Sequence, residues 1–224
     1  MSLKTEKKKP KSNFLYYLVK ITGAIPMLLY FRHKTYKFGD KPLPMKKRGN
    51  AVLTANHNSF LDPVIVSVVF GMRNLYYLAT KDLYNTKLKK FFFDRIHCII
   101  VDKENFSMSS LHEVCDRLKA GKVVTIFPEG QVNHSENEML SYKWGAVLMA
   151  FKGKAPIVPM YIAPRKHWYN RQRVVLGDPI DITELCGKMP TLVDLQNASE
   201  YVRQKELELQ DYYNNEILKD KKGK

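Results

Sequence analysis

The chain carries the run Ala51-Val52-Leu53-Thr54-Ala55-Asn56-His57-Asn58-Ser59-Phe60-Leu61-Asp62-Pro63. Its first five residues are apolar or β-branched and predict a buried strand, and the polar residues after them predict a turn. Pro63 suits the first position of a helix, with Asp62 as its N-cap. A strand, a polar turn and a helix in this order are typical of an α/β protein that keeps its chemistry at the ends of its strands.

A second strand with a polar end lies about seventy residues further along the chain. Val123-Val124-Thr125-Ile126 is apolar and β-branched, and Phe127-Pro128-Glu129-Gly130 follows it. Burying a glutamate at the end of such a strand costs free energy unless the carboxylate is paired or used, and a glycine permits a tight turn and close approach of a substrate. Pro-Glu-Gly is also a common turn composition, so a purely structural role stays open for this segment alone.

Alternating strands and helices predict an α/β fold with a central, mostly parallel sheet flanked by helices. One helix after Ser107 is indicated by apolar residues at Leu111, Val114, Cys115 and Leu118, with Gly121 as its stop. Besides the strand at 51–55, strands are predicted over 75–79, 98–101, 123–127, 157–162 and 173–176.

Three regions are predicted along the chain: residues 1–36, 37–190 and 191–224. The first joins a basic run to an apolar stretch, Phe14 to Phe31, that contains Lys20 and Pro26. We expect a membrane-associated helical segment lying in the interface, the alternative being a helix packed on the core behind a solvated basic tail. Residues 37–190 form the catalytic domain, and 191–224 form a charged helix with a lysine-rich tail.

The net charge of +15 implies an anionic partner, which is a nucleic acid, an anionic membrane surface or a phosphorylated substrate. No nucleic-acid-binding motif accompanies the lysines, which gather at the two ends of the chain, so we expect a membrane partner and no nucleic acid. Cys98, Cys115 and Cys186 lack metal-ligand spacing and are expected to be reduced thiols. We therefore expect the protein at the cytoplasmic face of the cell membrane, bound peripherally or monotopically.

His57 and Asp62 are the candidate catalytic pair. An aspartate five residues after a histidine can fix the imidazole tautomer and support the imidazolium as the ring accepts a proton. Backbone N–H groups at the same helix start can face a developing oxyanion. The structural alternative is that Asp62 only caps the helix and His57 fills a loop.

These residues resemble the glycerolipid acyltransferase superfamily, and within it the lysophosphatidic acid acyltransferase type. Asn56-His57 with Asp62 matches the family's N-H-x4-D motif, and Phe127-Pro128-Glu129-Gly130 matches the opening of its F-P-E-G-T-R-S motif. The resemblance covers roughly 51–181, with the blocks in the family's order. The weaker blocks are Lys81-Asp82-Leu83, Val101-Asp102-Lys103, Lys143-Trp144-Gly145-Ala146 and Pro156-Ile157-Val158-Pro159-Met160.

The resemblance implies an O-acyltransferase in which His57 is the general base and Asp62 orients it. The acceptor hydroxyl would attack an acyl thioester of coenzyme A or acyl carrier protein directly, with no acyl-enzyme, no metal and no tightly bound cofactor. A lysolipid would be the acceptor, by default lysophosphatidic acid. The expected substrate-binding residues are Glu129, Gly130, Lys81, Lys103, Asn56 and Gln131.

Two departures from the family's pattern bear on the acceptor. The family's Thr-Arg-Ser is here Gln131-Val132-Asn133, so the arginine expected to hold the phosphate is absent, and the arginine that closes the second block is here Lys103. A lysine is a point charge where arginine offers a bidentate fork. Either Lys81, Lys103 and Lys143 hold the phosphate, or the acceptor is a substituted lysophospholipid or another amphiphilic alcohol. An inactive membrane-surface scaffold of the same fold is the remaining alternative.

Overall fold

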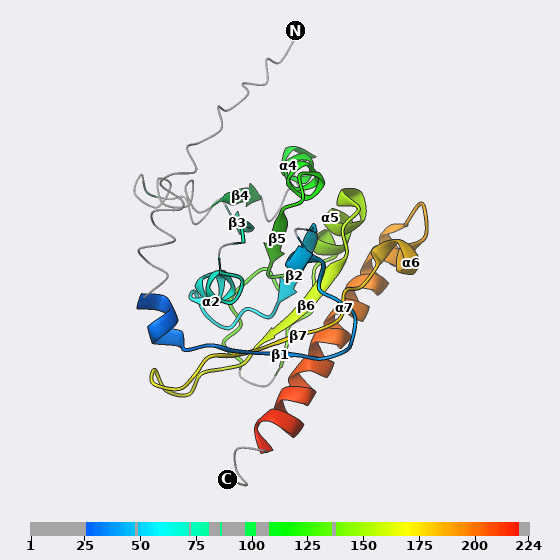
Figure 1. Ribbon diagram of the computed structural model, residues 1–224. Coiled ribbons are helices and arrows are strands. Elements are labelled where there is room, and N and C mark those ends of the chain that lie inside the picture. The colour runs from blue at the N-terminus through cyan, green and yellow to red at the C-terminus, as the bar shows by residue number, and fades with distance from the viewer. Residues whose placement is uncertain are drawn as a thin grey trace.

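The computed structural model describes residues 26–47, 49–71, 73–80, 86, 97–101, 108–135 and 138–219. Within them a seven-stranded sheet has the order β1-β7-β6-β2-β5-β3-β4 (Figure 1). Its strands are β1 Lys34–Lys37, β2 Ala51–Ala55, β3 Leu75–Thr80, β4 Cys98–Val101, β5 Val123–Ile126, β6 Ile157–Ile162 and β7 Arg173–Leu176.

Strands β2 to β6 run parallel to one another, while β7 is antiparallel to β6 and β1 is parallel to β7. The carboxyl ends of β2, β5 and β6 therefore meet at one edge of the sheet, which we call the catalytic edge. Because β1 runs the opposite way, its first residue, Lys34, pairs with Arg173 and lies at this edge too.

Helices cover both faces of the sheet. In Figure 1, α2 (Asp62–Val69) lies on one face, and α5 (Gly145–Gly153) and α7 (Leu192–Tyr212) lie on the other. The remaining helices are α4 Met108–Lys119, α6 Ile182–Cys186, the 3-10 turn η1 Pro44–Lys47 and the π-helical turn η3 Tyr213–Ile217. Residues 26–31 are also helical.

The burial of the strands explains this layered arrangement. Every residue of β2, β5 and β6 is buried, as expected for parallel strands covered on both faces. Val52 and Val124 pack toward α4, α5 and α7, whereas Leu53 and Val123 pack toward α2. The predicted α/β fold with a mostly parallel central sheet is thus confirmed.

Two local features differ from the sequence-based expectation. Strand β1 was not predicted, and it crosses the suggested boundary between residues 36 and 37. Asp62 is the first residue of α2, and its carboxylate makes no cap hydrogen bond within the helix. That carboxylate turns back toward His57 instead.

Several predictions fall outside the described residues. These are Lys81, Lys103, the lysine run and most of the apolar stretch before residue 26, and the tail after residue 219. In the part of the chain that the structure describes, no helix is both long enough and apolar enough to cross a bilayer.

Candidate active site

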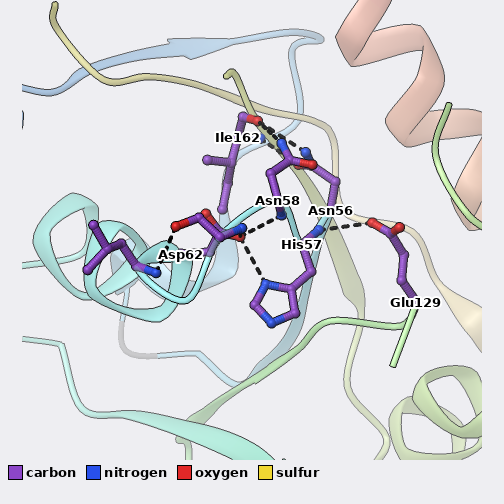
Figure 2. A network of polar contacts seen from close by, with 8 residues as sticks. Asn56, His57, Asn58, Asp62, Glu129 and Ile162 are labelled. Carbon is purple, nitrogen blue, oxygen red and sulfur yellow. Dashed lines mark hydrogen bonds and ion pairs between the residues drawn. The ribbon is translucent and has the colours of Figure 1, made fainter. Parts of the chain in front are cut away.

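The side chains of His57 and Asp62 meet in the turn between β2 and α2 (Figure 2). His57 Nδ1 lies 2.9 Å from Asp62 Oδ2, and the same oxygen accepts hydrogen bonds from the backbone N–H groups of Asn58 (2.7 Å) and Ser59 (2.8 Å). The Asp62 side chain is 2% exposed and that of His57 is 16% exposed. The sequence-predicted pair is therefore assembled, with the carboxylate buried and the imidazole reachable from solvent.

This arrangement sets the proton positions on the imidazole. A carboxylate oxygen that already receives two N–H donors acts as an acceptor, so His57 Nδ1 carries a hydrogen and donates it. The lone pair is then on Nε2, where it can accept a proton. The ring of Phe127 stacks on the imidazole with centroids 4.3 Å apart and limits its rotation.

The main chain of His57 is held from both sides. Its N–H donates to Glu129 Oε1 at 2.9 Å, and its carbonyl accepts from the N–H of Asn133 at 2.6 Å. Both partners belong to the loop after β5. The turn after β2 and the loop after β5 are therefore joined at the histidine, as expected for neighbouring parallel strands.

Glu129 is buried, and both of its oxygens accept backbone hydrogen bonds. Oε1 accepts from His57 and Oε2 from the N–H of Leu140 at 3.2 Å. Burial raises the pKa of Glu129 above its ordinary value, against the opposing effect of the hydrogen bonds from His57, Leu140 and Asn133. The structure thus gives this carboxylate a role in joining loops, and its contact with an acceptor stays a prediction.

Asn56 joins β2 to the end of β6. Its Oδ1 accepts from the N–H of Ile162 at 2.7 Å and its Nδ2 donates to the Ile162 carbonyl at 3.1 Å, while Asn58 Nδ2 donates to the same carbonyl at 3.2 Å (Figure 2). Asn56 is buried. These contacts hold the turn against β6, and a direct contact of Asn56 with substrate remains a prediction.

Gly130 forms the turn with a left-handed backbone conformation, at φ +73°. A Cβ atom at this position would lie 3.1 Å from both Cε and Nζ of Lys143, so the lysine side chain passes directly over the glycine. Gln131 follows on the surface. Lys143 is therefore the cation that the structure brings to the predicted acceptor-binding turn, while Lys81 and Lys103 lie outside the described residues.

The expectation that backbone N–H groups at this helix start face an oxyanion stays a prediction, and four of these groups are already used within the turn. The N–H groups of Asn58 and Ser59 donate to Asp62, that of Leu61 donates to Ser59 Oγ, and that of Asp62 donates to the Ser59 carbonyl. Two of these N–H groups hydrogen-bond to the buried Asp62 carboxylate that orients His57, and the other two bond to Ser59.

Sequence reasoning missed the residues behind this site. Asn133 was noted only as a departure from the family's motif, although it contacts both His57 and Glu129. Tyr142, which belongs to the segment 139–142, and Arg203 and Glu206, which contact that segment from behind, were not considered. Among the described residues no cluster of three His, Cys, Asp or Glu side chains is placed to hold a metal ion.

The arrangement of a buried carboxylate, an oriented imidazole and a glycine turn agrees with a comparison to known families. A model described as Acyltransferase matches residues 39–163, more than half of the chain, including both turns of the site. The chain belongs to the Acyltransferase family. It is an acyltransferase enzyme, and the resemblance to the lysophosphatidic acid acyltransferase type is confirmed.

Individual relatives in the Acyltransferase family extend the match. The 1-acyl-sn-glycerol-3-phosphate acyltransferase of Bacillus subtilis (strain 168) is 28% identical over 194 residues, covering 84% of this chain and 94% of the relative. The enzyme of that name from Streptococcus pneumoniae is 26% identical, covering 74% of this chain and 63% of its own. The crystal structure of the 1-acyl-sn-glycerophosphate (LPA) acyltransferase PlsC from Thermotoga maritima has a TM-score of 0.58 at 17% identity, covering 92% of this chain and 83% of that one, and shares the fold.

Proposed function

We propose that this acyltransferase moves a fatty acyl group from an acyl thioester to the free hydroxyl of lysophosphatidic acid, forming phosphatidic acid. The observation that carries the proposal is the pairing of His57 Nδ1 with the buried Asp62, which leaves Nε2 free as a base. The acceptor is supported by the relatives from Bacillus subtilis and Streptococcus pneumoniae, both called 1-acyl-sn-glycerol-3-phosphate acyltransferases.

In the proposed reaction, Nε2 of His57 takes the proton of the acceptor hydroxyl as the oxygen attacks the thioester carbonyl. Asp62 stabilises the imidazolium that forms. The tetrahedral intermediate then collapses, the C–S bond breaks, and the imidazolium returns its proton to the leaving thiolate of coenzyme A or acyl carrier protein. The ester oxygen comes from the acceptor, and the protein forms no covalent bond.

The acceptor phosphate is proposed to lie at the turn of Gly130 beside Lys143. The exposed ammonium group of Lys143 can pair with the phosphate there, and Lys81 and Lys103 are further candidates for the same role. Because Gln131 and Val132 replace the family's Thr-Arg, a lysophospholipid with a substituted phosphate is the second candidate acceptor. A phosphodiester carries a single negative charge where a phosphomonoester carries up to two, so it needs less charge compensation.

An anionic membrane surface at the cytoplasmic face is proposed as the partner of the catalytic edge. The helical residues 26–31 lie beside the loop 163–172 (Figure 1), where Arg165 donates to the Tyr30 carbonyl at 3.2 Å and lies over its ring. Leu29 and Trp168 are each 71% exposed, and Tyr169 is 54% exposed. Exposed aromatic and apolar side chains among cations are the composition that binds a lipid interface.

The charge of this surface supports the same partner. Residues 163–173 contain Arg165, Lys166, Arg171 and Arg173 and no acidic residue, and residues 26–34 add Arg32 and Lys34. The loop leaves β6 at Ile162, the residue bonded by Asn56, so the surface borders the site. A lysolipid would then reach His57 from the bilayer.

Membrane binding is tested by flotation with vesicles that contain an anionic phospholipid. The double variant Trp168→Ala/Tyr169→Ala should lower vesicle partitioning by about a hundredfold, since burying each such side chain contributes about 1.5 kcal/mol. Met189→Ala removes an apolar side chain that is even more exposed, at 92%, and lies outside this surface, and it should leave partitioning unchanged. Deleting residues 1–25 tests the apolar N-terminal segment separately. Unchanged partitioning in both the loop and deletion variants contradicts the membrane proposal.

Activity is tested with labelled acyl-CoA and acyl-acyl carrier protein against lysophosphatidic acid, glycerol 3-phosphate and substituted lysophospholipids. His57→Ala should lower kcat by about two to four orders of magnitude, the range of general base catalysis. His112→Ala, on the exposed side of α4, is the matched control and should retain full activity. A folded His57→Ala protein that is equally active contradicts the mechanism, and a product from substituted lysolipids alone selects the second acceptor.

A further inference from the structure

The C-terminal helix α7 contacts the loop that holds the site, although it lies outside the region matched by the family model, which ends at residue 163. Arg203 and Glu206 are three residues apart on this helix and therefore face the same way. Both point at the segment 139–142. This segment is the one whose Leu140 N–H holds Glu129.

Arg203 holds the main chain of that segment. Its Nε donates to the Leu140 carbonyl at 3.0 Å, and its Nη2 donates to the Met139 carbonyl at 2.9 Å. A guanidinium that bridges two successive carbonyls fixes the direction of the peptide between them. The Leu140 N–H is part of that peptide, so its aim at Glu129 depends on Arg203.

Glu206 holds the same segment through a side chain. Its carboxyl group is completely buried, and Oε2 accepts a hydrogen bond from the Tyr142 hydroxyl at 2.5 Å. Thr54 of β2, two residues before Asn56, lies near this carboxyl group. Neither its hydroxyl nor Glu206 Oε1 has a partner within hydrogen-bond geometry among the described residues. A buried carboxyl group placed between β2 and the loop is costly, and the proposed chemistry makes no use of it.

We propose that Arg203 and Glu206 are positioning residues for acyl transfer, acting through the segment 139–142 and Glu129 on the main chain of His57. The chain of contacts is continuous: α7 to Leu140 and Tyr142, Leu140 to Glu129 Oε2, and Glu129 Oε1 to the His57 N–H. The inference rests on the proposed role of His57 as the base.

The protonation state of Glu206 gives this arrangement a measurable signature. Burial, together with the nearby charge of Glu129, raises the pKa of Glu206 to about 8, so the group is neutral at pH 7. The titratable and charged groups nearest to it are Tyr142, whose pKa burial and Glu206 raise well above its ordinary value, and Arg203. Tyr161 of β6, whose pKa burial also raises, contacts Gln210, one helical turn after Glu206. Above pH 8 Glu206 becomes a second buried negative charge near Glu129, which should weaken the hold on His57.

The test measures kcat and KM from pH 6 to pH 9.5. The wild type should lose kcat above about pH 8, whereas Glu206→Gln, which keeps the shape and hydrogen bonds of the neutral acid, should retain most activity at pH 7 and lose this alkaline limb. Glu206→Ala should lower kcat by about ten- to a hundredfold with little change in the KM for the thioester. The exposed Glu208→Gln is the matched control and should behave as the wild type.

A double-mutant cycle keeps the proposal falsifiable if Glu206→Ala does not fold. Tyr142→Phe should lower kcat. At pH 9, where the wild type is expected to lose kcat, Glu206→Gln should raise kcat in the wild-type background but much less in Tyr142→Phe, because both changes act on one contact. An alkaline limb that persists in Glu206→Gln, or full kcat in folded Glu206→Ala, overturns the proposal. If His57→Ala is itself fully active, the proposed mechanism fails first, which separates the two failures.

Discussion

At His57, separate contacts fix an imidazole that remains partly exposed to solvent. Asp62 orients the ring through Nδ1, Phe127 stacks on it, and Glu129 and Asn133 hold the peptide groups on either side. Two of these contacts fix the ring, two fix the main chain, and none of them uses Nε2. The ring is therefore held in one orientation while Nε2 stays available to a substrate.

Gly130 offers a test of acceptor binding at a single residue. Gly130→Ala should lower the free energy of unfolding by about 1–2 kcal/mol, because φ is +73°, and should raise the KM for lysophosphatidic acid several-fold because the new Cβ displaces Lys143. Gly187→Ala is the matched control: φ is +67° there, but the space around it is open. Denaturant titration and steady-state kinetics measure the two effects, and an equal rise in KM for both variants would contradict the role of Lys143.

The sequence predicted the His57–Asp62 pair but not its supports, for a physical reason. His57 and Asp62 lie five residues apart in one turn, so local spacing alone brings them together. Glu129 was predicted as a site residue, but its contacts with His57 and Leu140 depend on strand pairing and on a loop closure that no local pattern encodes.

Among the elements, α7 lies far from His57 along the chain and yet contacts the loop that supports it. It packs along β6 and β7 and delivers two side chains to the loop behind the site. Its start is fixed by a capping box in which Thr191 Oγ1 accepts from the Asp194 N–H and the Asp194 side chain accepts from the Thr191 N–H. The capping box therefore stabilises the first turn of α7, while Arg203 and Glu206, closer to its other end, contact the loop behind the site.

A change in the capping box tests the stability of α7 separately from its positioning role. Thr191→Ala should lower the free energy of unfolding by about 1 kcal/mol, as the loss of an N-cap does, and should leave the pH dependence of kcat unchanged. Glu206 lies four turns away, so its contact with Tyr142 is untouched. Urea unfolding and the pH–rate profile measure both properties, and a profile altered like that of Glu206→Gln would assign the effect to the helix as a whole.

The elements also show where sequence patterns are sufficient and where they are not. The strands at 98–101, 157–162 and 173–176 were predicted with the observed bounds, because short apolar, β-branched runs are typical of strands that pack against a core. Strand β1 was missed because its residues are mostly exposed and its pairing with β7 is supplied from far along the chain. In α7, Glu206 occupies the apolar stripe of Leu195, Val202 and Leu209, and an acid on such a stripe is the signal that could have found it.

At the scale of the whole molecule, Glu206 links folding to pH. Its pKa is about 8 in the folded protein and near its ordinary value of 4.5 in the unfolded chain, so the folded state binds the extra proton between these values. The free energy of unfolding should therefore fall as pH rises from about 5 to about 8, by at most about 4 kcal/mol from this group. Once Glu206 has lost its proton, above about pH 8, its contribution to the free energy of unfolding is gone.

Urea unfolding at pH 5, 7 and 9 measures this dependence. Glu206→Gln should flatten the loss between pH 5 and pH 9, because an amide has no proton to lose, while Glu208→Gln should not. The lowered pKa values of Asp178 and Asp181 act in the opposite sense, and only as pH falls below about 4, so they do not mask the effect. An equally steep decline in Glu206→Gln would mean that another group is responsible.

The path of the chain through the sheet distributes positive charge unevenly over the molecule. Residue 26 leads into β1 at the catalytic edge, and the last described turn, η3, packs beside Ala163 at the same edge. Among the described residues, Arg32, Lys34, Arg165, Lys166, Arg171 and Arg173 lie on the segments that meet at this edge. Such an asymmetry is a dipole, and in the field of a negatively charged surface it turns an approaching molecule before contact. The protein would then reach the proposed membrane with His57 already facing the lipid, so it would be oriented before it binds.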